Sequence, residues 1–369
     1  MHKLPKRIVK EKPDFSNLEL AIKNETPKYL PFYELFVDIE IMEAILGHPV
    51  PMILSGTFAT ERKVEKDEIR QYNDSTVEFY YRIGYDYVPV VPGVPLKKSI
   101  GSTSDSECKI SSQKRMWQDE HKGFVENWKN FENYDWPTIT DVDFSSVEYL
   151  GSILPDGMKL ISGLPGLFEN VSWLPGIEKL CFMLYDEPDL VAALFSKIGS
   201  LWTKVFQVLA QMDSVGALLL ADDLGFYGGT FLPPDILRKH LFPWYSQIVS
   251  AAKKKNKPFI LHTCGNSKEV MSDLIAIGIN AKHSFEDKIQ PIWEAKQEYG
   301  KRIALLGGID MNILAKSTEK ETRRHVRSVL EQCAGKGYTL GSGNSVANYI
   351  KIENYLAMLD EGKKFRERA

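Results

Sequence analysis

The residues best suited to chemistry in this chain end an apolar run, Phe259-Ile-Leu-His-Thr-Cys-Gly-Asn266. Because successive residues of a strand point to opposite faces, His262 and Cys264 are expected on the same side, where both could bind one ion. An imidazole and a thiolate are typical zinc ligands. The competing interpretation is a buried histidine bonded to a backbone carbonyl, beside an unreactive cysteine.

Acidic side chains end two further apolar runs. Asp222 and Asp223 should face opposite ways, so that one faces a site while the other pairs with the next loop or caps a helix. Glu286 ends the run that begins at Ala281, where it could serve as an oxygen ligand or general base. His283 in the same run competes as a ligand, although a histidine within a strand is more often a satisfied core residue.

The run Tyr338-Thr-Leu-Gly-Ser-Gly-Asn-Ser345 places Ser342 and Asn344 on one face. The glycines at 341 and 343 would let the backbone approach a ligand closely.

Apolar segments that alternate with stretches of helical spacing must position these residues. The expected strands are Phe32–Val37, Tyr87–Val91, Lys159–Ser162, Ala217–Ala221, Phe259–His262, Ala281–Phe285, Ile303–Leu306 and Tyr338–Gly341. The expected helices are Ile39–Leu46, Lys63–Arg82, Pro188–Met212, Pro234–Lys255, Lys268–Ile277, Ile292–Tyr299 and Glu319–Cys333. Such strands indicate a parallel sheet that is buried on both faces. Eight strand–helix units predict an α/β fold, a (β/α)₈ barrel with chemistry at the C-terminal ends of its strands. A doubly wound open sheet competes, but no strand is followed by GxGxxG or a P-loop.

The expected organisation is one domain over residues 1–369, with an N-terminal extension at 1–30 and a lid-like insertion at 97–137 after the second strand. Aromatic residues in the insertion could stack on an aromatic substrate or simply pack the insertion. They are Trp117, Phe124, Trp128, Phe131, Tyr134 and Trp136.

Composition excludes several classes of protein. With 46 Lys+Arg against 49 Asp+Glu, the net charge of −3 argues against nucleic-acid binding. No apolar run approaches the roughly 18 residues of a membrane span, and the charged N-terminus does not resemble a signal peptide. A cytoplasmic protein is therefore expected. The four cysteines are too scattered for a disulfide framework; Cys333 is expected to be a packing residue, and Cys181 a core residue of an apolar helix over Gly176–Tyr185.

Five short runs together resemble the uroporphyrinogen decarboxylase superfamily in order and spacing over residues 150–362. They are Ala221-Asp-Asp-Leu-Gly225, Pro234-Asp-Ile-Leu, His262-Thr-Cys-Gly265, Gly307-Gly-Ile-Asp310 and Leu340-Gly-Ser-Gly-Asn344. The resemblance implies a (β/α)₈ barrel with its site at the C-terminal mouth, and dimerisation. The superfamily contains decarboxylases and zinc methyltransferases that work with corrinoid proteins.

Two departures separate these branches. The segment Phe32–Asp38 and its flanks contain none of the arginines with which true decarboxylases hold the carboxylates of a tetrapyrrole, and Ser342 stands where they carry histidine. The methyltransferase branch implies His262 and Cys264 as zinc ligands. Its coenzyme M members add a cysteine where this chain has Ser342, so Glu286 or Asp223 is expected to complete the site.

The sequence is most similar to methyltransferases of O-demethylase systems, which pass a methyl group from methoxylated compounds to a corrinoid protein. In this interpretation His262, Cys264 and Glu286 bind zinc, which polarises the donor oxygen while a Co(I) corrinoid attacks the methyl carbon. Further expected residues are Asp223, Glu286 and Asn344 for catalysis, and Ser342, Asp222 and Tyr227 for substrate binding.

The corrinoid should arrive on a separate protein. The pattern Asp-x-His-x-x-Gly of corrinoid-binding proteins is not matched, and Asp119-Glu-His-Lys-Gly123 is one residue short of it. Two alternatives to the methyltransferase are a metal-free decarboxylase and a non-catalytic protein that binds a corrinoid or tetrapyrrole.

Overall fold

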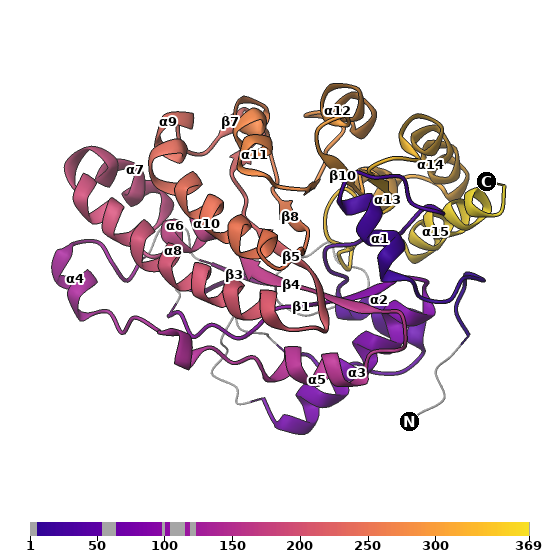
Figure 1. The fold of residues 1–369 in the computed structure, drawn as a ribbon, viewed down its shortest axis with the longest axis horizontal. Helices are drawn as coiled ribbons and strands as arrows, with labels where there is room; N and C mark the ends of the chain where they lie inside the picture. Colours follow the sequence, from indigo (N-terminus) through magenta and orange to yellow (C-terminus); the bar gives the residue numbers. More distant parts are fainter. Residues whose placement is uncertain (1–5, 54–63, 98–99, 104–114, 119–122, 369) are drawn as a thin grey trace.

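A parallel sheet of seven strands forms the centre of the protein (Figure 1), in the order β1-β4-β5-β8-β9-β10-β11. The structure is a computed structural model that describes residues 6–53, 64–97, 100–103, 115–118 and 123–368. The strands are β1 (Tyr87–Val90), β4 (Lys159–Pro165), β5 (Val215–Ala221), β8 (Phe259–His262), β9 (Ala281–His283), β10 (Ala304–Leu306) and β11 (Tyr338–Thr339). Each neighbouring pair is parallel and the sheet curls on itself, so the predicted (β/α)₈-type fold is confirmed.

The eighth position of the barrel is taken by the segment predicted as the strand Phe32–Val37. Isolated parallel bridges at Phe32 and Val37 join it to the β11 side of the sheet. On its other side, the Tyr87 hydroxyl of β1 accepts a hydrogen bond from the Glu34 amide at 2.7 Å and donates one to the Glu34 carbonyl. The segment forms no regular ladder with β1, because the Tyr87 hydroxyl bonds the Glu34 amide and carbonyl that a ladder would use.

Helices surround the sheet (Figure 1), and their hydrophobic residues pack on it. They are α1 (Phe15–Ile22), α2 (Ile39–Leu46), α3 (Lys66–Arg82), α4 (Trp128–Asn133), α5 (Ser145–Ile153), α6 (Leu167–Trp173), α7 (Ile177–Asp186), α8 (Pro188–Gln211), α9 (Pro234–Ile236), α10 (Phe242–Lys253), α11 (Met271–Ile277), α12 (Ile292–Tyr299), α13 (Met311–Lys316), α14 (Glu319–Cys333) and α15 (Ile352–Arg366). The predicted helix Pro234–Lys255 is interrupted by a π-helical turn over Leu237–Leu241. Pro243 follows this turn and has no N–H to donate to a carbonyl one turn back, which explains the irregularity.

Helix α1 covers the end of the barrel at which the strands begin. The Phe15 amide donates to the Gly157 carbonyl at 2.8 Å, and the Phe15 ring lies against Gly216 at the start of β5. The Gly337 amide, just before β11, donates to the Glu25 carbonyl at 3.0 Å. The extension therefore closes this end and leaves the opposite mouth to the functional residues.

The stretch between β1 and β4 holds the antiparallel pair β2 (Ile100–Thr103) and β3 (Arg115–Gln118), followed by α4. Trp128, Phe131 and Trp136 pack edge to face or at a tilt, and the Lys197 ammonium of α8 lies 6.0 Å from the Trp136 ring centre. These contacts fit the packing interpretation of the aromatic residues, while the lid role of 97–137 stays a prediction. The side chain of Trp117, and residues 119–122 of the corrinoid-like pattern, lie outside the described part.

Two expectations about single residues can be compared with the structure. Cys333 is buried as expected, but Cys181 is exposed, so its placement in the core was wrong. Helix α7 buries Leu180 and Met183, and Cys181 lies on its other face.

Among the described helices, none combines the length and hydropathy that a membrane crossing requires.

Candidate metal centre

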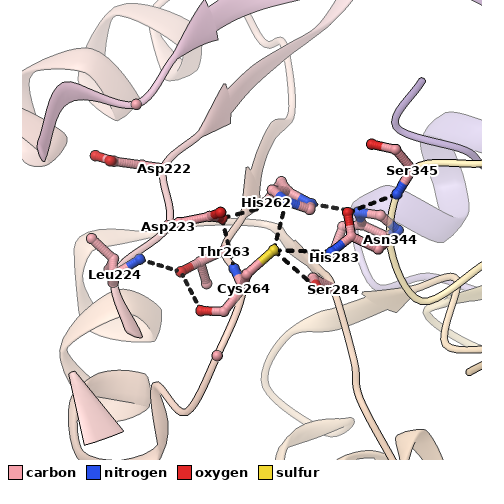
Figure 2. A network of polar contacts seen from close by, with 12 residues as sticks. Asp222, Asp223, Leu224, His262, Thr263, Cys264, His283, Ser284, Asn344 and Ser345 are labelled. Carbon is pink, nitrogen blue, oxygen red and sulfur yellow. Dashed lines mark hydrogen bonds and ion pairs between the residues drawn. The ribbon is translucent and has the colours of Figure 1, made fainter. Parts of the chain in front are cut away.

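Three ligand atoms gather at the ends of β5 and β8 (Figure 2): a carboxylate oxygen of Asp223, a ring nitrogen of His262 and the sulfur of Cys264 lie within 4.8 Å of one another. Cys264 Sγ is 3.3 Å from His262 Nε2, and Asp223 Oδ1 is 3.6 Å from the same nitrogen. The predicted side-by-side placement of His262 and Cys264 is thus present in the structure.

The two adjacent acids at the end of β5 point in different directions, as predicted. Asp223 Oδ1 accepts the Cys264 amide at 2.9 Å, while Asp222 points away from the cluster (Figure 2). The carboxylate of Asp222 is fully buried and accepts the amides of Phe168 and Glu169 at 2.8 and 3.0 Å. It also accepts the Tyr245 hydroxyl at 2.7 Å. Asp222 thus holds the start of α6, and its predicted role in substrate binding stays a prediction.

Gly265 allows the chain to turn directly after Cys264. Its φ of +73° is strained for any residue with a side chain, and a Cβ there would lie 2.1 Å from the Gly225 carbonyl oxygen. Gly225 begins the small hairpin of β6 (Gly225–Phe226) and β7 (Gly229–Thr230), which therefore packs on the loop that carries Cys264. Tyr227 lies in the turn of this hairpin and is 71% exposed. Its predicted contact with substrate stays a prediction.

The sulfur of Cys264 accepts hydrogen bonds from two other strand ends. Asn344 Nδ2 lies 3.1 Å from Sγ, and the Ser284 hydroxyl lies at 3.7 Å. The Ser345 amide donates to Asn344 Oδ1 at 2.7 Å, which fixes the amide so that its NH₂ group faces the sulfur. Burial and the neighbouring Asp223 raise the pKa of the Cys264 thiol, and a bound cation would reverse this effect.

His262 is an uncharged imidazole in this environment. Burial and then the Lys282 ammonium lower its pKa to about 3. Its Nδ1 lies 2.8 Å from Nδ1 of His283, which is also buried and whose pKa burial lowers well below the ordinary value. His283 Nε2 lies in turn 3.1 Å from the Ser342 carbonyl. His283 is thus a partner of the candidate ligand His262, which the sequence treated as a competing ligand or a core residue.

Glu286, the third predicted ligand, is not part of the three-atom cluster. Its Oε1 accepts the Gly265 amide at 3.3 Å, and its side chain lines a small cavity together with Lys282. The Lys282 ammonium donates to the carbonyls of Ser284 at 2.6 Å and Thr263 at 3.4 Å. Burial lowers the pKa of Lys282 to about 8. The role of Glu286 as a ligand or base stays a prediction, and Asp223 is the carboxylate that the fold places beside His262.

Glu34, which the sequence did not single out, lies in the barrel interior beside Ser342. It is fully buried, accepts the Ser342 amide at 2.9 Å and contacts the Ser342 hydroxyl, which also reaches the Asn344 carbonyl. Burial raises the pKa of Glu34 to about 8. The hydroxyl of Ser342 is therefore used by neighbouring protein groups, and its predicted contact with substrate stays a prediction.

The donor set itself fits a divalent cation. An imidazole nitrogen, a sulfur and a carboxylate oxygen converge on one point, and the imidazole is neutral. Zinc accepts this combination of nitrogen, sulfur and oxygen ligands.

Comparisons with known proteins identify the family. The profile described as uroporphyrinogen decarboxylase (URO-D) matches residues 125–365. Among curated relatives, the uroporphyrinogen decarboxylase of Coxiella burnetii (strain RSA 493 / Nine Mile phase I) is 26% identical over 187 residues, which cover 50% of this chain and 50% of that protein. The uroporphyrinogen decarboxylase of Thioalkalivibrio sulfidiphilus is 27% identical over 191 residues, which cover 49% and 51%. The chain thus spans about half the length of the curated relatives it matches.

Two solved structures share the fold over nearly the whole chain. A methyltransferase from Methanosarcina mazei superposes with a TM-score of 0.65 at 16% identity, covering 95% of this chain and 98% of that one. A B12-independent methionine synthase from Shewanella sp. W3-18-1 gives a TM-score of 0.51 at 12% identity, covering 92% and 98%. The family profile covers more than half of the sequence, and the chain belongs to the uroporphyrinogen decarboxylase (URO-D) family.

Proposed function

We propose that the protein is a zinc-dependent methyltransferase that moves a methyl group from a methoxylated aromatic donor to the corrinoid of a partner protein. The observation that carries the proposal is the convergence of Asp223, His262 and Cys264 on one point of the barrel mouth. The fold shared with the Methanosarcina mazei methyltransferase supports the same choice.

Each residue of the centre has a part in this function. Asp223, His262 and Cys264 would hold the zinc ion, which acts as a Lewis acid toward the donor oxygen. Asn344 and Ser284 direct their N–H and O–H groups at the sulfur and so orient it and reduce its electron density. A set with one sulfur, one nitrogen and one oxygen leaves zinc more electron-poor than a sulfur-rich set would. Such a centre is suited to an ether or hydroxyl oxygen rather than to a thiol.

The test joins metal analysis to an activity assay, with two cysteine variants as a matched pair. Cys264→Ala removes the candidate ligand, whereas Cys181→Ala removes an exposed thiol on α7 that lies outside the centre. Wild type and Cys181→Ala should contain about one zinc per chain and demethylate a methoxylated aromatic compound in the presence of a reduced corrinoid protein. Cys264→Ala should lose both properties. Full activity after exhaustive chelation would contradict the proposal.

A decarboxylase is the second candidate, favoured by the matches to uroporphyrinogen decarboxylases, which cover about half of the chain. Against it, the segment that would hold the carboxylates of a tetrapyrrole carries the buried acid Glu34 and no arginine. If the protein released CO₂ from a tetrapyrrole carboxylate after a chelator had removed all metal, this function would be established in place of the methyltransferase.

A further inference from the structure

The buried imidazole of His283 connects the candidate ligand His262 to a fixed backbone carbonyl. His283 is 0% exposed, and both of its ring nitrogens have partners. Nδ1 lies 2.8 Å from Nδ1 of His262, and Nε2 lies 3.1 Å from the carbonyl oxygen of Ser342.

These two contacts determine where the protons of both rings lie. A carbonyl oxygen can only accept, so Nε2 of His283 carries a proton. The neutral ring then has a lone pair at Nδ1, so the proton between the rings belongs to Nδ1 of His262. Nε2 of His262 is left with a free lone pair, and this nitrogen faces Cys264 and Asp223.

The carbonyl at the far end of this chain of contacts is itself held in place. The Ser342 amide donates to Glu34 Oε1 at 2.9 Å, and the Ser342 carbonyl also accepts the Gly308 amide at 3.2 Å. Glu34 is fully buried on the segment that occupies the eighth barrel position. The contacts thus run from this segment through the ends of β11, β9 and β8 to the metal centre.

We propose that His283 is a positioning residue that fixes the tautomer and ring orientation of His262, and that Glu34 and Ser342 hold His283 for this task. The inference rests on the proposed metal centre and deepens it. The opposite tautomer of His262 would carry a proton on Nε2, in the direction from which a cation must bind. Partners of this kind typically change metal affinity by about 10–100-fold.

Two substitutions separate positioning from packing. His283→Leu fills much of the space but cannot accept the proton of His262 Nδ1. His283→Asn retains an amide oxygen near the position of the original Nδ1 and can accept that proton. His325→Leu is the matched control, since it removes a largely buried histidine of α14 whose side chain is 17% exposed and which lies outside these contacts.

Zinc affinity is measured on the full chain by competition with a chromophoric chelator. His283→Leu should bind zinc about 10–100-fold more weakly than wild type, and His283→Asn should recover most of that loss. His325→Leu should match wild type. Unchanged affinity in a folded His283→Leu protein would overturn the proposal, as would equal losses in the Leu and Asn variants.

A second measurement needs no variant and therefore holds even if His283→Leu does not fold. In zinc-free wild-type protein labelled with ¹⁵N-histidine, long-range ¹H–¹⁵N spectra should show His262 protonated at Nδ1 and His283 at Nε2. Protonation of His262 at Nε2 would overturn the proposal. A protein with the expected tautomers that binds no zinc would instead overturn the proposed function and leave the assignment of His283 standing.

Discussion

At the scale of single residues, Asp223 and Glu286 are the two carboxylates that could complete the candidate metal centre. Asp223 Oδ1 lies 3.6 Å from His262 Nε2, whereas Glu286 Oε1 contacts the Gly265 amide and its side chain lines the neighbouring cavity. Asp223→Asn should therefore weaken zinc binding by about tenfold or more, and Glu286→Gln should change it by less than about threefold. Chelator competition measures both values, and a larger loss in Glu286→Gln would assign the ligand position to Glu286.

Glu34 should make the stability of the protein depend on pH. Because burial raises its folded pKa to about 8 from the ordinary 4.5, the folded state binds more protons than the unfolded state between these values. The contribution of Glu34 to the free energy of unfolding should then fall as pH rises from about 4.5 to 8. Asp86 and Asp222 act in the same direction, but only up to their folded pKa of about 6.

The window between pH 6.5 and 8 lies above the folded pKa of Asp86 and Asp222, but Lys282, whose pKa burial lowers to about 8, acts in the opposite direction near pH 8. The test therefore compares two proteins: from pH 6.5 to pH 8, calorimetry should show the melting temperature of zinc-free wild type falling relative to that of Glu34→Gln, in which the amide can still accept the Ser342 amide. An equal decline in wild type and variant would assign the effect to other groups.

At the scale of elements, Asp222 joins strand β5 to helices α6 and α10. Its carboxylate accepts two amides at the start of α6 and the Tyr245 hydroxyl of α10. Asp222→Ala should lower the free energy of unfolding by about 1–3 kcal/mol, because buried donors lose their acceptor, and should leave zinc affinity close to wild type. Asp223→Ala is the matched variant, with the opposite expectation of lost zinc affinity and a smaller change in stability. Urea unfolding and chelator competition on both proteins test the pair.

The sequence predicted those elements whose ends are marked by local chemistry. Helices α12 and α14 have the predicted ends, and β8 has the predicted bounds. Helix α14 begins at a capping box in which Thr318 and Glu321 bond each other's backbone, a signal that is local in sequence. Alternation along β8 likewise placed His262 and Cys264 on the same side, and at the end of β5 it predicted that Asp222 and Asp223 diverge without showing which of them faces the site.

The contacts around these ligands could not be predicted in the same way. The pairing of His283 with His262 depends on the register of β8 against β9, where these two residues are directly opposite. Glu34 meets Ser342 across a sequence separation of 308 residues. The spacing of residues in a single sequence does not indicate such neighbours. They can be identified only from the three-dimensional arrangement of the strands.

At the scale of the whole molecule, the candidate site forms only when the barrel closes, because its residues come from strands on both sides of the seam. The candidate ligands come from β5 and β8, and their supporting residues come from β9, the end of β11 and the segment at the eighth position. That segment meets β1 through the Tyr87 hydroxyl rather than through a ladder of backbone hydrogen bonds. On the β1 side, the position of Glu34 therefore depends on one side chain at the seam, while backbone bridges hold the segment on the β11 side.

Substitutions of two stacked tyrosines test this dependence. Tyr87→Phe should lower the free energy of unfolding by about 1–3 kcal/mol, because the amide and carbonyl of Glu34 both lose a buried partner. Tyr33 is the matched control, since its ring stacks on Tyr87 at 5.6 Å, both rings are fully buried, and its hydroxyl has no hydrogen-bond partner among the described residues. Tyr33→Phe should be neutral or slightly stabilising in urea unfolding. Equal destabilisation of the two variants would show that ring packing, and not the hydroxyl of Tyr87, holds the seam closed.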